Sequence, residues 1–136
     1  MNQLAFLLLS VVILSTCRDQ RSSDVQSREE RFQEITSLTD LPASIQETLG
    51  VGRKGYEGIA DAGDSFNITD VVDTNVPNRR FTIAGISNTH LLVAIERGGR
   101  AHNFQIVLFE LPRTQRGEWT LVEKPANLRA LLDSVP

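Results

Sequence analysis

The sequence predicts an α+β domain: a three- to four-stranded, mainly antiparallel meander sheet with two N-terminal helices and one C-terminal helix. Three β-rich runs lie between residues 80 and 111, and Gly98-Gly99, which separates the last two, is typical of a two-residue hairpin turn. Apolar residues recur at helical spacing before these runs and again after them. Strands that follow one another through short turns usually pair, so we expect a meander.

An apolar run, LAFLLLSVVIL, occupies residues 4–14. Eleven helical residues cover about 16 Å, whereas a bilayer core requires roughly 30 Å, so the run is too short for a stable membrane span. Its length is typical of the hydrophobic region of a secretory signal peptide. We therefore predict that residues 1–16 form a signal peptide.

The only cysteine of the chain, Cys17, follows this run in the sequence Leu14-Ser15-Thr16-Cys17. An aliphatic residue, two small residues and a cysteine resemble the lipobox of bacterial lipoproteins, and the resemblance covers residues 1–17. In that family the cysteine becomes the first residue after cleavage, and its thiol carries a diacylglycerol. The resemblance implies a cell-envelope lipoprotein anchored on a membrane through Cys17. The alternative is a secreted or periplasmic protein cleaved near the same residue.

Residues 18–31 are almost entirely polar, and Val25 is their one aliphatic side chain. Such a segment buries too little apolar surface to offset the entropy of ordering it. We predict a flexible tether over residues 17–27 and a single globular domain over residues 28–136. A domain of that size can bury a core without disulfides.

The first predicted helix begins near Ser27, which forms a capping-box pattern with Glu30. Phe32, Ile35 and Leu38 then recur at helical spacing and give this helix one apolar face.

The second predicted helix follows Asp40, which can cap its N-terminus, and has Pro42 in its first turn. Three residues at i, i+4 and i+8 form its apolar face: Leu41, Ile45 and Leu49. Gly50 is placed to end this helix in a left-handed conformation. In the glycine-rich segment that follows, residues 56–60 predict a short strand.

Side chains with oxygen ligands recur at every third position of the next segment: Asp61, Asp64, Asn67, Asp70 and Asp73. The calcium loop of an EF-hand places its early ligands at every second position, so this spacing does not match it. Asp and Asn side chains often bond nearby backbone amides in turns, and we interpret these residues in that way. Because His90 and His102 fall on opposite faces of the predicted sheet and no second cysteine exists, we predict no metal site.

If both turns of the meander contain two residues, Arg97 lies opposite Arg100 on one side and opposite Arg80 on the other. The face that they share is otherwise mostly apolar, with Ala84, Ile86, Leu91, Val93, Ile95, Phe104, Ile106 and Leu108. We expect the helices to cover it.

Beyond Pro112, residues 118–123 predict a fourth strand that contains Trp119, which we interpret as a core residue. A C-terminal helix is predicted to start at Pro125 and to dock on the sheet through Leu128, Leu131, Leu132 and Val135.

The predicted register gathers Arg80, Arg97, Arg100 and His102 at one end of the sheet. Guanidinium groups that lie close together repel one another and favour a bound anion such as phosphate or carboxylate. His102 can donate a hydrogen bond to the same anion. The sequence therefore predicts an anion-binding site at this edge.

The overall charge is −3, from 14 basic and 17 acidic residues, which argues against a nucleic-acid-binding protein. The chain contains no phosphate-binding loop and no dinucleotide fingerprint, so we predict no cofactor. We expect a non-enzymatic binding or structural domain whose partner is an anionic ligand or an envelope protein. The alternative is a small envelope hydrolase in which His102 works with a carboxylate from the 57–73 loop.

Overall fold

The computed structural model describes residues 31–70 and 73–136, which form a five-stranded sheet in the order β1-β2-β3-β4-β5. All neighbouring strands are antiparallel. The strands are β1 (Gln33–Ile35), β2 (Arg79–Ile86), β3 (His90–Arg97), β4 (Asn103–Glu110) and β5 (Thr114–Leu121). The predicted α+β class and antiparallel meander are confirmed, but the sheet has five strands rather than three or four.

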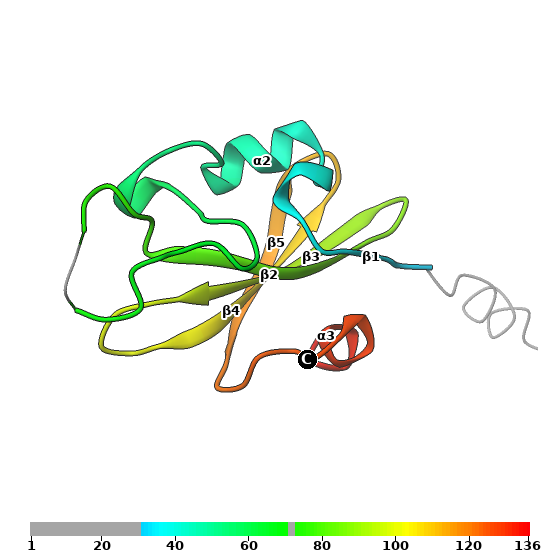
Figure 1. The fold of residues 1–136 in the computed structure, drawn as a ribbon. Coiled ribbons are helices and arrows are strands. Elements are labelled where there is room, and N and C mark those ends of the chain that lie inside the picture. Colours follow the sequence, from blue (N-terminus) through cyan, green and yellow to red (C-terminus); the bar gives the residue numbers. More distant parts are fainter. Residues whose placement is uncertain (1–30, 71–72) are drawn as a thin grey trace, which may run out of the picture.

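The helices of the described residues are short. They comprise the α-helices α2 (Ala43–Leu49) and α3 (Leu128–Asp133) and the 3-10 turns η1 (Leu38–Asp40) and η2 (Gly55–Glu57). Figure 1 shows α2 on one side of the sheet and α3 on the other. None of the helices in this part of the chain is long and apolar enough to cross a bilayer. The predicted signal peptide, Cys17 and the tether lie outside the described residues.

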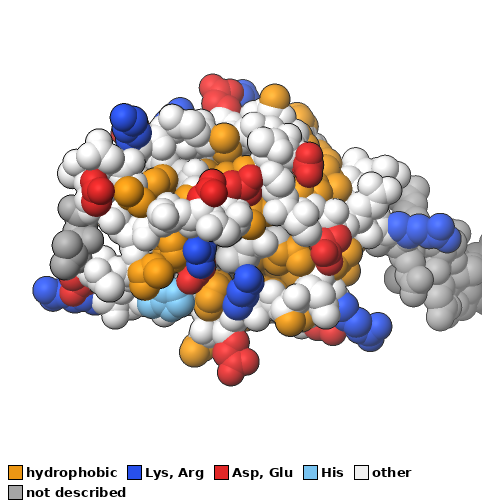
Figure 2. Space-filling view, in the orientation of Figure 1, with side chains coloured by type: hydrophobic (Ala, Val, Ile, Leu, Met, Phe, Trp, Pro, Cys, Tyr) orange, Lys and Arg blue, Asp and Glu red, His pale blue; other side chains and the backbone are white. Residues whose placement is uncertain are grey.

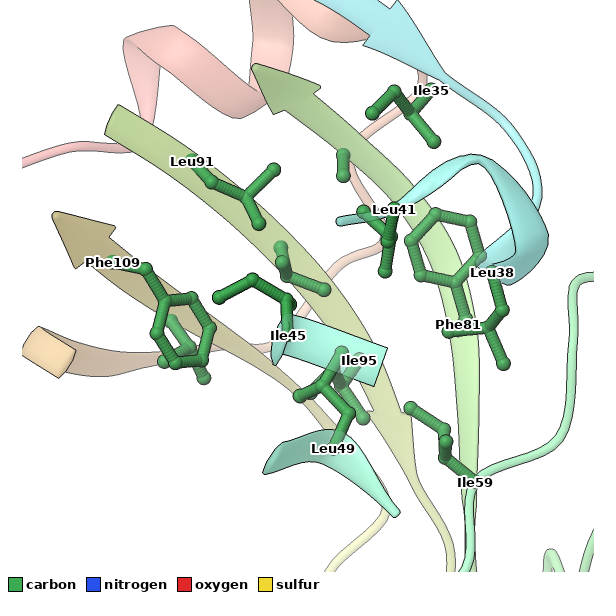
Figure 3. Close-up of a cluster of buried hydrophobic side chains, with 13 residues drawn as sticks. Ile35, Leu38, Leu41, Ile45, Leu49, Ile59, Phe81, Leu91, Ile95 and Phe109 are labelled. Atoms are coloured by element: carbon green, nitrogen blue, oxygen red, sulfur yellow. The ribbon is translucent and has the colours of Figure 1, made fainter. Parts of the chain in front are cut away.

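Each face of the sheet has its own core. On the α2 side, buried residues of α2, η1 and the sheet form one cluster, and Figure 3 shows Ile45 and Leu49 of α2 beside Ile95 of the sheet. On the α3 side, Leu131 is fully buried against a second cluster of Ile83, Leu92, Ala94 and Ile106. Trp119 packs against this second cluster, as its interpretation as a core residue predicted. Because both faces are covered, the central strands are apolar almost throughout.

The first predicted helix is wrong where the structure tests it. Residues 33–35 are a strand that pairs with the edge of β2, Ile35 opposite Ala84, and its proposed cap at Ser27 lies outside the described residues. Ile35 and Leu38 are buried as the helical pattern required, because an extended segment followed by a 3-10 turn places both against the same core. Pairing with an open sheet edge therefore outweighs a weak helical pattern.

The second predicted helix is confirmed, with one correction. α2 ends at Gly50, whose φ of 83° is left-handed as expected. Pro42, rather than Asp40, occupies the N-cap position, and no side chain caps this end. Asp40 instead belongs to η1. The strand predicted over residues 56–60 reduces to two isolated bridges, Ile59 with Val51 and Ala60 with Arg80.

A bulge in β2 sets the register that matters for the site. Ala84 lies opposite Val93 as predicted, but Thr82 has no partner in β3, and beyond it Phe81 lies opposite Ile95. The Thr82 hydroxyl donates to the carbonyl of Ala94 at 3.0 Å. A bulge inserts one residue into a strand, so every residue before it is shifted by one position.

The connection between β3 and β4 contains five residues, 98–102, instead of the predicted two. Val93 consequently lies opposite Val107 rather than Phe104. An odd shift in register moves every side chain of a strand to the other face. Phe104 and Ile106 thus face the α3 side, and Val107 and Phe109 fill the core under α2.

The C-terminal elements are also displaced from their predicted bounds. The fourth predicted strand, residues 118–123, corresponds to β5, which begins earlier, at Thr114. α3 begins at Leu128 rather than at Pro125, because the Asn127 side chain caps it by accepting a hydrogen bond from the Ala130 amide at 2.9 Å. This helix docks on the sheet through Leu131 and Leu132, as predicted, but Val135 is exposed and lies beyond the end of the helix.

Candidate functional site

The four residues predicted to bind an anion lie in two separate places. Arg97 and Arg100 line one pocket, whereas Arg80 and His102 both bind Glu96. The physical reasons are the two register changes described above. The bulge pairs Arg80 with Glu96 instead of Arg97, and the five-residue loop removes Arg100 from the position opposite Arg97.

Glu96 is a nearly buried carboxylate, with 10% of its side chain exposed, held by two partners. Its Oε2 accepts hydrogen bonds from Arg80 Nη2 at 2.7 Å and Nε at 3.1 Å, and its Oε1 lies 2.8 Å from His102 Nε2. The Arg80 guanidinium also stacks over Phe66, 4.4 Å from the ring centroid. The His102 ring packs edge-on against Phe104. Arg80, Glu96 and His102 thus form a charged network that packs against the rings of Phe66 and Phe104.

The pKa of Glu96 reflects this network. Burial of the carboxylate alone would raise its pKa, but hydrogen bonds from His102 and Arg80, together with their charges, lower it below the ordinary value of 4.5. Glu96 is therefore ionised at neutral pH, and Arg80 is committed to it. The charges of Arg80 and Glu96 compensate one another. Little net positive charge therefore remains in this network to attract an external anion.

The carboxylate beside His102 comes from β3 and not from the 57–73 loop, as the hydrolase alternative required. In that loop, Asp61 is used structurally: its carboxylate accepts hydrogen bonds from the Ser37 hydroxyl at 2.6 Å and the Leu38 amide at 2.9 Å. Among the described residues, no serine, threonine or cysteine hydrogen-bonds His102. The described geometry thus gives His102 an acidic partner but no nucleophile.

The aspartates and asparagines spaced by three act mainly on backbone groups. Asn67 is buried, and its amide nitrogen donates to the carbonyls of Asp73 at 2.9 Å and Val76 at 2.7 Å. Asp73 accepts from the Asn75 amide at 2.8 Å. Asp61, Asn67 and Asp73 thus bond nearby backbone groups as turn residues do, whereas Asp70 pairs with the side chain of Arg100. Over residues 31–70 and 73–136, no three His, Cys, Asp or Glu side chains are grouped to hold a metal ion.

A pocket of about 430 Å³ lies where β2 begins and β3 ends. Three arginines line it, Arg79, Arg97 and Arg100, and Asp70 is the one carboxylate among the described residues of its lining. On the face shown in Figure 2, acidic and basic side chains are interspersed rather than gathered. Because the overall charge of the chain is −3, the excess of positive charge at the pocket is a local feature.

Arg79 is held rigidly at the pocket by backbone carbonyls. Its Nη2 donates to the carbonyl of Leu49 at the end of α2 (2.8 Å) and to that of Glu57 (3.2 Å), and its Nε donates to that of Gly58 (3.2 Å). None of the hydrogen bonds found among the described residues uses its Nη1. A guanidinium fixed in this way is a preorganised donor that loses little entropy when it binds an anion.

Arg79 and Arg97 are direct cross-strand neighbours, and neither has a salt bridge to a carboxylate among the described residues. Burial lowers the pKa of the Arg79 guanidinium, and the charge of Arg97 lowers it further. Like charges directly opposite on a sheet destabilise it. A bound anion would relieve this repulsion.

Arg100 completes the pocket from a more exposed position. Its Nε lies 3.0 Å from Asp70 Oδ2, with 89% and 55% of the two side chains exposed. Such surface pairs contribute little to stability, so a ligand can compete for this arginine at small cost.

Tyr56 also lines the pocket. Sequence reasoning identified Arg97 and Arg100 but missed Arg79, Glu96 and Tyr56. Arg79 is adjacent to the predicted Arg80, and the only signal that separates the two is the bulge at Thr82. No protein-family model, curated protein or solved structure matches this chain.

Proposed function

We propose that this domain is a non-enzymatic binding module that takes an anionic group, phosphate or carboxylate, in the pocket formed by Arg79, Arg97 and Arg100. One observation carries the proposal: two cross-strand arginines, Arg79 and Arg97, line a pocket without a carboxylate partner among the described residues. Anions that accept charge-assisted hydrogen bonds from arginine satisfy this arrangement directly. Relative to the sequence-based site, Arg79 takes the place of Arg80, and His102 is not included.

The hydrolase alternative is the weaker proposal. It is supported by the 2.8 Å contact between His102 and Glu96, a geometry that suits a general base. However, Glu96 is shared with Arg80, and the described residues bring no nucleophile to the histidine. A binding function requires none of these missing parts.

Replacing Arg97 by glutamine is the direct test of the pocket. Arg97 is exposed and has no salt bridge in the described structure, so the variant should fold normally. We expect it to weaken binding of inorganic phosphate, measured by calorimetry at low salt, by at least about tenfold, because a charged hydrogen bond contributes roughly 1.5–3 kcal/mol. Phosphate should also raise the melting temperature of the wild-type protein more than that of the variant.

The matched control is Arg113→Gln, which removes the same charge from an exposed position in the connection between β4 and β5. It should bind phosphate as the wild type does. Equal affinity for all three proteins would contradict the proposed pocket. These measurements use the chain from residue 17 onward with Cys17→Ser. Both core clusters lie between residues 32 and 132, so this change removes nothing from either.

We further propose that the domain is presented at the bacterial cell envelope by a lipid on Cys17. Two or more acyl chains give a stable membrane anchor, and a polar segment of about 14 residues spans on the order of 20 Å. Such a tether would hold the anion-binding domain close to the membrane surface.

The full-length chain expressed in a bacterial host tests this location. We expect a membrane-bound product that starts at Cys17 and carries added acyl mass in intact-mass spectra. Cys17→Ala should abolish both the cleavage and the added mass, because the thiol is the site of modification. A soluble product without acyl mass from both chains would instead indicate a secreted or periplasmic protein.

A further inference from the structure

Tyr56 is an exposed aromatic residue in the lining of the arginine pocket, with 69% of its surface accessible. It belongs to η2, and the carbonyl of the next residue, Glu57, accepts a hydrogen bond from Arg79 Nη2 at 3.2 Å. The same short turn therefore carries the aromatic residue and contacts the half-buried arginine. The backbone of Tyr56 is thereby placed beside the point where an anion would bind, and its exposed ring lines the pocket.

A second exposed apolar residue adjoins the pocket. Ile68, 51% exposed, precedes the lining residue Thr69, and its carbonyl accepts a hydrogen bond from the Gly99 amide at 2.9 Å. In the described part of the chain the exposed large hydrophobic residues are Tyr56, Ile68, Val122 and Val135. Of these four, Tyr56 lines the pocket and Ile68 precedes a lining residue, so Tyr56 is the one that offers apolar surface next to the arginines.

The size and charge of the pocket limit the class of ligand that it can bind. A volume of about 430 Å³ lies in the range of sites that hold small organic molecules, and exceeds what phosphate alone needs. Three arginines against one aspartate leave an excess of two positive charges. A phosphate monoester carries between one and a half and two negative charges near neutral pH, roughly this excess, whereas a single carboxylate would neutralise only half of it.

We infer that the ligand of this pocket is a phosphate monoester whose organic group is an aromatic or other flat ring that packs on Tyr56. The phosphate is held by Arg79 and Arg97, and the ring lies on the phenol face. Stacking on an aromatic side chain tolerates many ring chemistries, so the contact selects a class of ligand rather than one compound. This inference rests on the proposed anion-binding function.

Phenyl phosphate and inorganic phosphate are the two probes that test it, in calorimetric titrations of the chain described above. We expect the wild type to bind phenyl phosphate about fivefold more tightly than phosphate, a difference of about 1 kcal/mol, which is typical of an aromatic contact. Tyr56→Ala should abolish this preference and leave the affinity for inorganic phosphate within twofold. Tyr56→Phe should keep the preference, because it retains the ring.

Val122→Ala is the control for removal of an exposed apolar side chain, because Val122 is 89% exposed and follows β5, away from the pocket lining. It should preserve the preference for phenyl phosphate. Equal affinity of the wild type for the two probes, or a preference that survives in Tyr56→Ala, would overturn the inference and leave anion binding intact. Binding of neither probe would overturn both the inference and the proposed function.

Discussion

Replacing Glu96 by glutamine should lower the free energy of unfolding by about 2–3 kcal/mol, measured by urea denaturation at pH 7. The carboxylate is nearly buried and is the common partner of Arg80 and His102. Removing one member of a buried ion pair leaves the other charge without compensation. The expected loss lies below that of a fully buried pair, because Arg80 and His102 are partly exposed and can reach water.

The pH dependence of the free energy of unfolding should distinguish the loss of the Glu96 charge from a simple loss of packing. The pKa of Glu96 is lower in the folded protein than its ordinary value of 4.5. The stability that its ionisation contributes is therefore complete above about pH 4.5 and disappears as the pH falls through the folded-state pKa. The difference in stability between the wild type and Glu96→Gln should consequently shrink as the pH is lowered from 5 toward 3.

Glu123→Gln is the matched control, because Glu123 is exposed and takes part in no ion pair found among the described residues. It should change the free energy of unfolding by less than about 0.5 kcal/mol. If Glu96→Gln changed the free energy of unfolding as little as this control, the network of Arg80, Glu96 and His102 would not stabilise the fold.

Local patterns predicted those elements whose contacts are themselves local or regularly spaced. The spacing of Ile45 and Leu49, followed by Gly50, predicted α2 and its end, because a helix with one apolar face and a left-handed C-cap is encoded within ten residues. The apolar run from Leu91 to Ile95 likewise predicted a strand, and the structure buries it on both faces.

The register could not be predicted in the same way, because it depends on contacts between distant segments. Gly98-Gly99 suggested a tight turn, but the Gly98 amide donates to the carbonyl of Asn78 and the Gly99 amide to that of Ile68. These bonds attach the 98–102 loop to the 67–78 segment instead of closing a two-residue turn. No local rule contains that information.

The composition of the pocket depended on the same register. A single residue, Thr82, decides whether Arg80 or Arg79 lies beside Arg97, and threonine is common in regular strands. The sequence therefore predicted the correct end of the sheet for the arginine cluster. That Arg79 rather than Arg80 lies beside Arg97 could be seen only in the structure. Arg80 and His102 were predicted on the face of Arg97, but both contact Glu96 on the opposite face.

Replacing Gly50 by alanine should destabilise the domain by about 3 kcal/mol and weaken the pocket at the same time. Gly50 has a φ of 83°, and a Cβ built on it would lie 1.9 Å from the carbonyl oxygen of Glu57. That oxygen accepts a hydrogen bond from Arg79. Alanine must therefore displace the η2 turn, which holds both Arg79 and Tyr56 at the pocket.

Gly52→Ala isolates the cost of the left-handed backbone, because Gly52 has a φ of 82° and no atom lies within 4 Å of its Cβ position. We expect it to cost about 1 kcal/mol and to leave phosphate affinity unchanged. Gly50→Ala should add the displacement of η2 to this cost and bind phosphate several-fold more weakly at a temperature where it remains folded. Equal stabilities for the two variants would mean that the Glu57 carbonyl moves freely, and the rigid positioning of Arg79 would then be wrong. A less stable Gly50→Ala with unchanged phosphate affinity would separate the end of α2 from the pocket, and the anion would be held mainly by Arg97 and Arg100.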